Sequence, residues 1–341
     1  MFTALILFGT RPEVIKLAPV IRALGRRADR VRSVVVSSSQ HVDLLRPHLE
    51  LLRIDVHHDL QTMQIGQSPS SVLTRCLERM TALIERETPD VVIIQGDTTT
   101  ALAGALAAFY ARVPVAHVEA GLRTGNLASP FPEEAHRSLI ARVARWHFAA
   151  TRANARTLRA EGVSARDIFV VGNTVVDSVH AMLAKTQSSP AVDSLVDATR
   201  GQRRIVLTTH RRENFGAVMD TQLDTLRRFV ERHPDVTLIS PVHPNPAVRD
   251  AVSRRLLGGD RIHLTEPMSH GDFLWLVRRS WLIVSDSGGI QEEAPSLGKP
   301  LLVLRDTTER PEAFECGVAR LAGHDPVQIE AMLEEAYADS G

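Results

Sequence analysis

The chain has 341 residues, in which 40 lysines and arginines balance 40 aspartates and glutamates, and 44% of the residues are hydrophobic. This composition excludes disorder, which needs low hydrophobicity and a high net charge, and it leaves no charge surplus to attract nucleic acid or anionic lipid. At roughly 100 to 200 residues per domain, the length predicts about two domains, each with its own core.

Short β-rich apolar runs alternate with helical stretches, which is the pattern of parallel βαβ units. In the first half we expect strands at Phe2–Phe8, Val31–Ser37, Val91–Ile94, Val113–Val118, His147–Ala150 and Ile168–Val171. In the second half we expect them at Arg204–Thr209, Thr237–Val242, Arg261–Leu264, Trp281–Ser285, Leu301–Leu304 and Ala319–Ala322. The fold class predicted is α/β, with two Rossmann-like, doubly wound parallel sheets facing a central cleft.

The first of these runs, Phe2 to Phe8, is far shorter than the roughly 20 residues of a membrane span and has no cleavage site after it. The two cysteines, Cys76 and Cys316, are too few for a disulfide framework and lack the spacing of metal ligands. We therefore expect a cytoplasmic protein with no membrane partner and no nucleic-acid partner.

One helical segment has a clear apolar stripe, formed by Val72, Cys76, Met80 and Leu83, so Cys76 is interpreted as a packing residue. The stretch Thr186 to Gln202 is polar and weakly patterned, and we expect a loose connection there. We place the domain boundary near Val171, which divides the chain into residues 1–170 and 171–341.

Ligands of open α/β sheets bind beyond the carboxyl ends of the strands, and here we expect them between the two sheets. After the first predicted strand, Gly9 permits a tight turn and Pro12 suits the first helical position. Arg11 and the start of a helix that carries Lys16 would then face the ligand, although an ordinary turn with a solvated arginine fits this motif nearly as well.

Three carboxylates follow successive elements of the first predicted sheet: Asp97, Glu119 and Glu133. Asp97 or Glu133 alone would fit a helix cap or a first-turn acid. Three such acids together, with Glu119 behind an apolar strand, favour acid/base chemistry, because burial can raise the pKa of a carboxyl group. In the second half, His210 and His243 stand at strand ends, where a site and a structural role are equally plausible.

The segment Ser285 to Ala294 contains Ser287, Gly288 and Gly289 directly after an apolar strand and at the start of a helix. Small residues let a diphosphate approach the backbone, and helix N–H groups attract that anion. Glu293, one turn into the helix, is placed to accept both ribose hydroxyls. The segment therefore predicts a nucleotide-diphosphate site.

Together these segments resemble the non-hydrolysing UDP-N-acetylglucosamine (UDP-GlcNAc) 2-epimerase family. The matching stretches are 8–13, 96–100, 117–125, 172–174, 285–300 and 305–313, in order along nearly the whole chain. The resemblance implies the GT-B-like fold of two-domain glycosyltransferases. It also implies interconversion of UDP-GlcNAc and UDP-ManNAc by anti elimination of UDP to a 2-acetamidoglucal and re-addition to the other face, in support of cell-surface polysaccharide.

The resemblance also assigns roles to residues. Asp97, Glu119 and Glu133 become catalytic carboxylates, and His210 becomes a leaving-group or acid/base partner. The substrate-binding residues it implies are Arg11, Lys16, His243, Ser287, Gly288, Gly289 and Arg310 on the diphosphate, Glu293 on the ribose and Phe273 near the uracil. No cofactor and no metal are implied, since the step at C2 is a proton transfer and Arg and His can neutralise the diphosphate.

Bacterial members of that family use UDP-GlcNAc as an allosteric activator, and Gln40, His41, Gln67 and Arg123 match or neighbour this second site. A homodimer is expected from the family. Two departures stand out: His136 occupies a position where relatives have Asn, and the segment and final helix that relatives send back to the first domain are absent before Gly341.

Three other readings remain open. A glycosyltransferase of the same fold would hold the nucleotide similarly but needs one base at most. A hydrolysing epimerase would release free ManNAc and UDP. A non-catalytic nucleotide-sugar sensor would need none of Asp97, Glu119 and Glu133.

Overall fold

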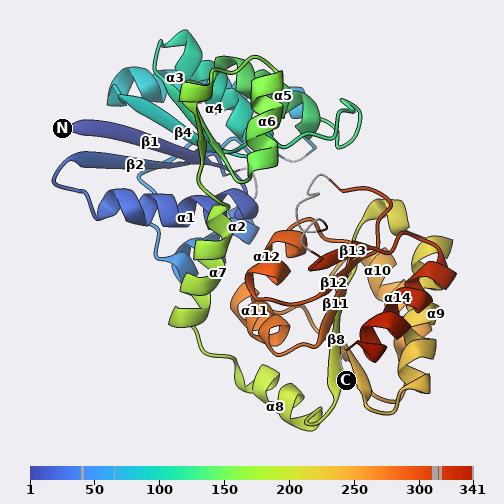
Figure 1. Cartoon of the computed structure of the whole chain (residues 1–341). Coiled ribbons are helices and arrows are strands. Elements are labelled where there is room, and N and C mark those ends of the chain that lie inside the picture. The colour runs from blue at the N-terminus through green and yellow to red at the C-terminus, as the bar shows by residue number, and fades with distance from the viewer. Residues whose placement is uncertain (40–41, 65, 309–313, 315–316, 340–341) are drawn as a thin grey trace. The chain divides into compact units, whose positions relative to one another are not determined.

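The computed structural model describes residues 1–39, 42–64, 66–308, 314 and 317–339. The chain forms two compact units, Met1–Ser178 and Val179–Gly341, drawn in Figure 1 in blue to green and in green-yellow to red. The division falls inside helix α7 (Thr174–Lys185), a few residues beyond the boundary expected near Val171.

The first unit is a seven-stranded parallel sheet with the strand order β3-β2-β1-β4-β5-β6-β7. Before α7, its elements are β1 (Phe2–Phe8), α1 (Arg11–Gly25), β2 (Val31–Ser37), α2 (Val42–Leu52), β3 (His58–Asp59), α3 (Pro69–Glu87), β4 (Val91–Gln95), α4 (Thr99–Tyr110), β5 (Val115–Ala120), α5 (Glu133–Val143), β6 (Trp146–Ala149), α6 (Arg152–Ala160), the 3-10 turn η1 (Ala165–Asp167) and β7 (Ile168–Val170). The order reverses between β1 and β4, as in a Rossmann sheet.

The second unit repeats this plan with six parallel strands in the order β10-β9-β8-β11-β12-β13. Its elements are α8 (Pro190–Ala198), β8 (Arg203–Thr208), η2 (Arg212–Asn214), α9 (Ala217–Arg232), β9 (Val236–Pro241), α10 (Pro246–Leu256), β10 (Ile262–Thr265), α11 (His270–Arg278), β11 (Leu282–Ser285), α12 (Ile290–Ser296), β12 (Leu301–Val303), β13 (Ala319–Leu321) and α14 (Pro326–Ala338). Here the order reverses between β8 and β11.

The predicted fold class is confirmed as two Rossmann-like parallel sheets, and most predicted strands end within a residue or two of the observed ends. The two-residue strand β3 was not predicted, because two residues are too few to show the alternation of apolar and polar side chains that marks a strand. That the sheets face a shared cleft stays a prediction. In the described part of the chain, no helix combines the length and apolar character that a membrane crossing requires.

The expectation of a loose connection between Thr186 and Gln202 was wrong, because α8 lies within it. Ser189 caps this helix by accepting from the Val192 amide, and Pro190 stands at its start. Val192 is buried among the second unit's core residues. The cap and the proline were visible in the sequence, but the single turn of apolar residues was too short to reveal the helix.

The apolar stripe of α3 is confirmed, since Val72, Cys76, Met80 and Leu83 are all buried. Because successive strand residues point to opposite faces, Leu5 and Leu7 of β1 pack with this stripe. The first core therefore forms where the sequence placed it.

Cys76 is expected to resist alkylation in the native protein. Its side chain is fully buried, and burial raises the pKa of the thiol to about 12, so the reactive thiolate is scarce at neutral pH. Iodoacetamide treatment followed by peptide mass spectrometry should leave Cys76 unmodified until urea unfolds the chain. Rapid native labelling at Cys76 would contradict a packing role.

Candidate active site

The turn after β1 is organised by a buried glutamate, Glu13. Its Oε2 accepts hydrogen bonds from the Gly9 amide at 3.0 Å and from the Thr10 amide and hydroxyl at 2.8 Å each. Its Oε1 accepts from the Thr98 hydroxyl at 2.7 Å, in the turn after β4. Because β1 and β4 flank the point where the strand order reverses, Glu13 joins the two turns where such sheets bind ligands.

Gly9 is required here for close packing, since an added Cβ would overlap the hydroxyls of Ser38 and Thr100. Pro12 is the second residue of α1, one position beyond the predicted one, because Arg11 begins the helix, with its side chain exposed. The turn is therefore closely held on its inner side while Arg11 remains accessible.

Glu13 is expected to make the protein less stable as pH rises. Burial is the largest influence on the pKa of Glu13, and it raises that pKa from 4.5 to about 7 against the opposing hydrogen bonds. Between these two values the folded chain keeps a proton that the unfolded chain has released. The free energy of unfolding should therefore fall by roughly 3 kcal/mol as pH rises from below about 4.5 through about 7.

Glu13→Gln should remove this loss, since its amide stays neutral and can donate to the Thr98 hydroxyl. Urea unfolding of both proteins at about pH 5 and about pH 8 measures it. The control is Glu78→Gln on α3, where the side chain of Glu78 is exposed. An equal fall in stability in the Glu13→Gln protein would show that another group is responsible.

Asp97 lies in the turn between β4 and α4, next to Gly96, whose φ is 70°. The cap of α4 is Thr98, which accepts from the Ala101 amide, so the alternative that Asp97 is the helix cap is wrong. His117 Nε2 donates to the Gly96 carbonyl at 2.7 Å. Burial lowers the pKa of His117 to about 3, which keeps this ring neutral.

Arg137 of α5 holds the Asp97 carboxylate. Its Nε donates to Oδ2 at 2.7 Å, and a second guanidinium nitrogen lies 2.6 Å from the same oxygen. His136, the residue noted as a departure from relatives, donates from Nδ1 to the Asp97 carbonyl at 2.8 Å. Two consecutive residues of α5 therefore fix the backbone and the side chain of Asp97.

Glu119 near the end of β5 occupies a strained backbone position. Its φ is 64°, and the pairing of β5 with β6 shifts register between Val118 and Ala120, which is uncommon for a residue with a side chain. Lys16 Nζ lies 2.5 Å from Oε1 of Glu119, and the Gln95 amide donates to Oε2. Lys16, expected on the diphosphate, thus forms a nearly buried ion pair with a candidate catalytic acid.

Glu133 begins α5, as predicted, and is half-buried. Its neighbour Glu134 is buried and joins the ion-pair network, with Oε2 at 3.1 Å from Arg137 Nη1. Oε1 of Glu134 accepts from the amides of Thr124 and Gly125 at 3.0 Å each. The structure therefore links Asp97 to Glu134 through Arg137, a connection the sequence reasoning did not make.

Of the four residues expected at the activator site, the structure describes two. Gln40 and His41 lie outside the described residues. Gln67 accepts from Arg75 at 2.9 Å, just before α3. Arg123 forms a two-bond ion pair with Glu161 at 2.7 and 2.8 Å. Gln67 and Arg123 are thus held by different partners within the first unit.

In the second unit, His210 follows β8 and its imidazole stacks on that of His243, with ring centroids 5.4 Å apart. Its Nδ1 lies 3.4 Å from Oδ1 of Asp286, a fully buried carboxylate after β11. The structure therefore brings together two predicted site residues and adds an acid that the sequence reasoning had left without a role.

The predicted diphosphate turn, Ser287 to Gly289, connects β11 to α12, and an added Cβ at Gly289 would meet no atom closer than 4.0 Å. Glu293 lies in the first turn of α12, with Oε1 at 3.0 Å from His270 Nε2. Phe273 packs on two core clusters from α11. Arg310 lies outside the described residues. Within this turn Gly289 is exposed and Gly288 is buried.

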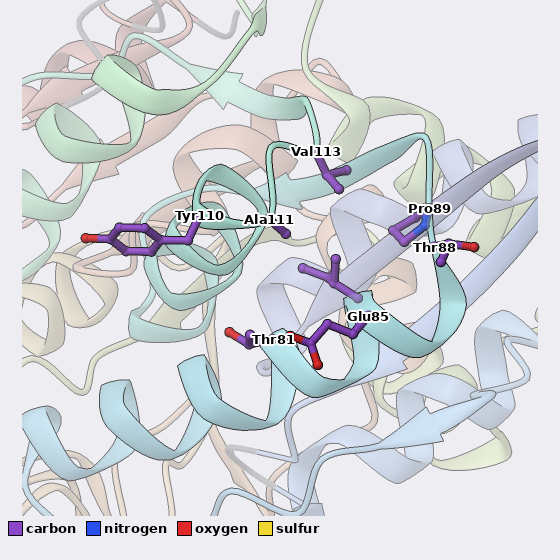
Figure 2. Close-up of a pocket in the computed structure, with 8 residues that line it drawn as sticks. Thr81, Glu85, Thr88, Pro89, Tyr110, Ala111 and Val113 are labelled. Carbon is purple, nitrogen blue, oxygen red and sulfur yellow. The ribbon is translucent and has the colours of Figure 1, made fainter.

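A cavity of about 430 Å³ lies elsewhere in the first unit. Figure 2 shows its lining: Thr81 and Glu85 come from α3, Tyr110 ends α4, and Pro89 and Val113 precede β4 and β5. Because Pro89 and Val113 precede β4 and β5, the cavity lies at the amino ends of these strands. Asp97 and Glu119 lie at their carboxyl ends. The cavity does not belong to the candidate site.

Five contacting residues were not assigned roles from the sequence: Glu13, Gln95, Glu134, Arg137 and Asp286. Glu13, Gln95, Glu134 and Asp286 stand at the end of an apolar strand or at a helix start, which was their signal in the sequence. Arg137 lies in the second turn of α5 and carried no such signal. Within the described ranges, no three His, Cys, Asp or Glu side chains gather so as to hold a metal ion. That the reaction needs no metal stays a prediction.

The class that fold and site define is a GT-B-like α/β protein, with acidic side chains at the strand ends of one Rossmann-like unit and a small-residue turn in the other. A family model described as UDP-N-acetylglucosamine 2-epimerase matches residues 23–341. The chain therefore belongs to the UDP-N-acetylglucosamine 2-epimerase family, which confirms the resemblance drawn from the sequence.

Individual relatives agree with this assignment. The UDP-N-acetylglucosamine 2-epimerase of Escherichia coli K12 is 44% identical over 95% of this chain and 88% of its own length. The Neisseria meningitidis enzyme, solved with bound UDP-GlcNAc, is 39% identical, with a TM-score of 0.89 over 98% of this chain and 91% of that one. MnaA of S. aureus, solved with UDP, is 38% identical, with a TM-score of 0.89 over 100% and 89%.

Proposed function

We propose that this protein interconverts UDP-GlcNAc and UDP-ManNAc without hydrolysis, by anti elimination of UDP to a 2-acetamidoglucal and re-addition of UDP to the other face. The observation that carries the proposal is the pair of held carboxylates, Glu119 with Lys16 and Asp97 with Arg137, at the carboxyl ends of neighbouring strands. The relatives crystallised with UDP-GlcNAc and with UDP support the nucleotide-sugar substrate.

The chemistry explains why cations and acids are needed together. The C2 proton is not adjacent to a carbonyl group, so it becomes acidic only as the C1–O bond breaks and positive charge grows on the ring. A carboxylate near C2 then removes the proton, while cationic and N–H groups stabilise the departing diphosphate. Re-addition reverses these steps with a proton delivered to the opposite face.

In this proposal the first unit supplies the proton-transfer groups. Asp97, Glu119 and Glu133 exchange protons with the sugar. Arg137 orients Asp97, and Lys16 and Gln95 orient Glu119. Burial of the Lys16–Glu119 pair strengthens its electrostatic interaction relative to that of a solvated pair.

The second unit supplies the nucleotide site. In the turn Ser287 to Gly289, the N–H groups of Gly288 and Gly289 are offered to the diphosphate, assisted by Arg11, His243 and Arg310. Glu293 accepts the ribose hydroxyls, Phe273 lies near the uracil and His210 assists the departing UDP. No cofactor enters the scheme, because no hydride moves.

The test is to incubate the purified protein with UDP-GlcNAc in heavy water and follow C2 by NMR. We expect deuterium at C2 of both UDP-GlcNAc and UDP-ManNAc, with no free ManNAc. Release of ManNAc and UDP would instead identify a hydrolysing epimerase. Sugar transfer to an acceptor without exchange at C2 would identify a glycosyltransferase.

We also propose a homodimer. The side chains of Phe109 and Tyr110 on α4 and of Leu139 on α5 are exposed on two helices that contact each other, and apolar surface of this kind favours association. Light scattering should give twice the chain mass of 37.5 kDa, and Tyr110→Glu should reduce it. A monomer at micromolar concentration would contradict the proposal.

Two further parts of the proposal concern context. We propose that UDP-GlcNAc activates the enzyme at a second site that includes Gln67 and Arg123; a hyperbolic rate curve for UDP-ManNAc, unchanged by traces of UDP-GlcNAc, would count against it. We also propose that the reaction takes place in the cytoplasm, where it supplies ManNAc, carried on UDP, for cell-surface polysaccharide.

A further inference from the structure

The carboxylate of Asp286 is completely buried and surrounded by donors. Oδ2 accepts from the Thr209 hydroxyl at 2.8 Å, from the amides of His210 and Arg211 at 3.0 Å each, and from the Asn214 amide group at 3.1 Å. All four donors belong to one segment, the turn that follows β8. A buried carboxylate is stable only with such compensation.

This carboxylate lies where the second sheet reverses its strand order. Asp286 follows β11 and the turn follows β8, and these two strands are hydrogen-bonded neighbours. Ligands of open α/β sheets bind at this switch point. Asp286 therefore determines the conformation of the turn that borders the expected site.

One member of that turn is His210, the candidate partner of the leaving group. Oδ1 of Asp286 accepts from the His210 amide at 3.1 Å and lies 3.4 Å from Nδ1 of its imidazole. The ring of His243 stacks on that of His210 with an interplanar angle of 20°. The ring is thus held through its backbone, its Nδ1 edge and its plane.

We propose that Asp286 is a positioning residue that keeps a proton on Nδ1 of His210, so that Nε2 is the nitrogen that exchanges a proton with the reacting groups. A carboxylate beside one imidazole nitrogen favours the tautomer protonated there. This assignment rests on the proposed function for the role of His210. The tautomer itself does not depend on turnover.

The diphosphate turn has a separate support. The hydroxyls of Thr208 and Ser285 lie 2.7 Å apart across β8 and β11, and Ser285 Oγ accepts from the Ser287 amide at 2.9 Å. Loss of the Asp286 charge should therefore disturb His210 more than it disturbs nucleotide binding. The expected signature is a fall in kcat with little change in KM or in UDP affinity.

The test uses Asp286→Asn, which keeps the size of the side chain but loses its charge. With UDP bound, ring 15N shifts of histidine-labelled wild type should show the His210 proton on Nδ1, assigned by its loss in His210→Gln. In Asp286→Asn we expect the proton to shift toward Nε2 and kcat to fall by about 100-fold or more. KM and UDP affinity should each change by less than about threefold, because the diphosphate turn is held by other contacts.

The matched control is Thr209→Val, which removes one donor to the same carboxylate but neither contact with His210. It should keep kcat within about threefold, as expected for loss of one hydrogen bond away from the reacting groups. A wild-type proton on Nε2, or unchanged kcat in folded Asp286→Asn, would overturn the proposal. If Asp286→Asn does not fold, the position of the His210 proton in the wild type still tests the proposal. Absence of C2 exchange in the wild type would instead refute the proposed function.

Discussion

Asp97→Asn is expected to abolish deuterium exchange at C2 of UDP-GlcNAc while leaving UDP affinity within about twofold, a change of no more than about 0.4 kcal/mol. The asparagine oxygen can still accept from Arg137, so the turn after β4 keeps its conformation. The amide cannot take or deliver the C2 proton. The loss should therefore appear in kcat, by about a thousandfold or more, as is typical when a reacting acid/base group is removed.

The measurement pairs NMR of the C2 proton in heavy water with calorimetric titration of UDP. Asp167→Asn is the matched control, because it is the same substitution in another arginine-paired aspartate of the first unit, before β7. This control should exchange C2 at the wild-type rate. Retained exchange in Asp97→Asn would remove Asp97 from the mechanism.

Lys16→Met is expected to lower both stability and activity, because the carboxylate of Glu119 loses its counter-ion. The ammonium of Lys16 and the carboxylate of Glu119 are nearly buried, with side-chain exposures of 8% and 7%. Removal of one partner from such a pair costs about 3 to 5 kcal/mol, because the remaining charge has lost its counter-ion. The hydrogen bond from Gln95 does not replace that charge.

A double-mutant cycle separates the two effects. Glu119→Gln in the Lys16→Met background should recover most of the urea stability but none of the activity, because the buried charge is gone and so is the acid. Arg227→Met, which breaks the more exposed pair with Glu231 on α9, is the control and should cost at most about 1 kcal/mol. If the changes in the free energy of unfolding caused by Lys16→Met and Glu119→Gln were additive, the interaction between the two side chains would contribute little to stability.

The parts of the fold that follow from local pattern were predictable. The strand β1 ends where the apolar run ends, and Cys76 is buried where the helical period places it. Helix α8 was missed because one turn of apolar residues gives no readable period. Glu119 was predicted as an acid at a strand end, but its left-handed backbone at a register shift depends on how β5 pairs with β6.

The candidate site was predictable as a set of residues but not as a set of contacts. Asp97, Glu119 and His210 stand after apolar strands, and the position alone marks them. That Arg137 holds Asp97, or that Asp286 receives four donors from the turn after β8, involves residues far apart in the chain. No local pattern contains such a pairing.

The sequence by itself determined two parallel α/β sheets, the acids at their strand ends and the small-residue turn, because hydrophobic period and turn chemistry act over a few neighbouring residues. Only the tertiary structure decided that Lys16 faces Glu119, that Glu13 joins the turns after β1 and β4, and that Asp286 faces His210. These contacts exist because parallel strands distant in sequence end side by side, so their charges are paired by strand order and not by spacing along the chain.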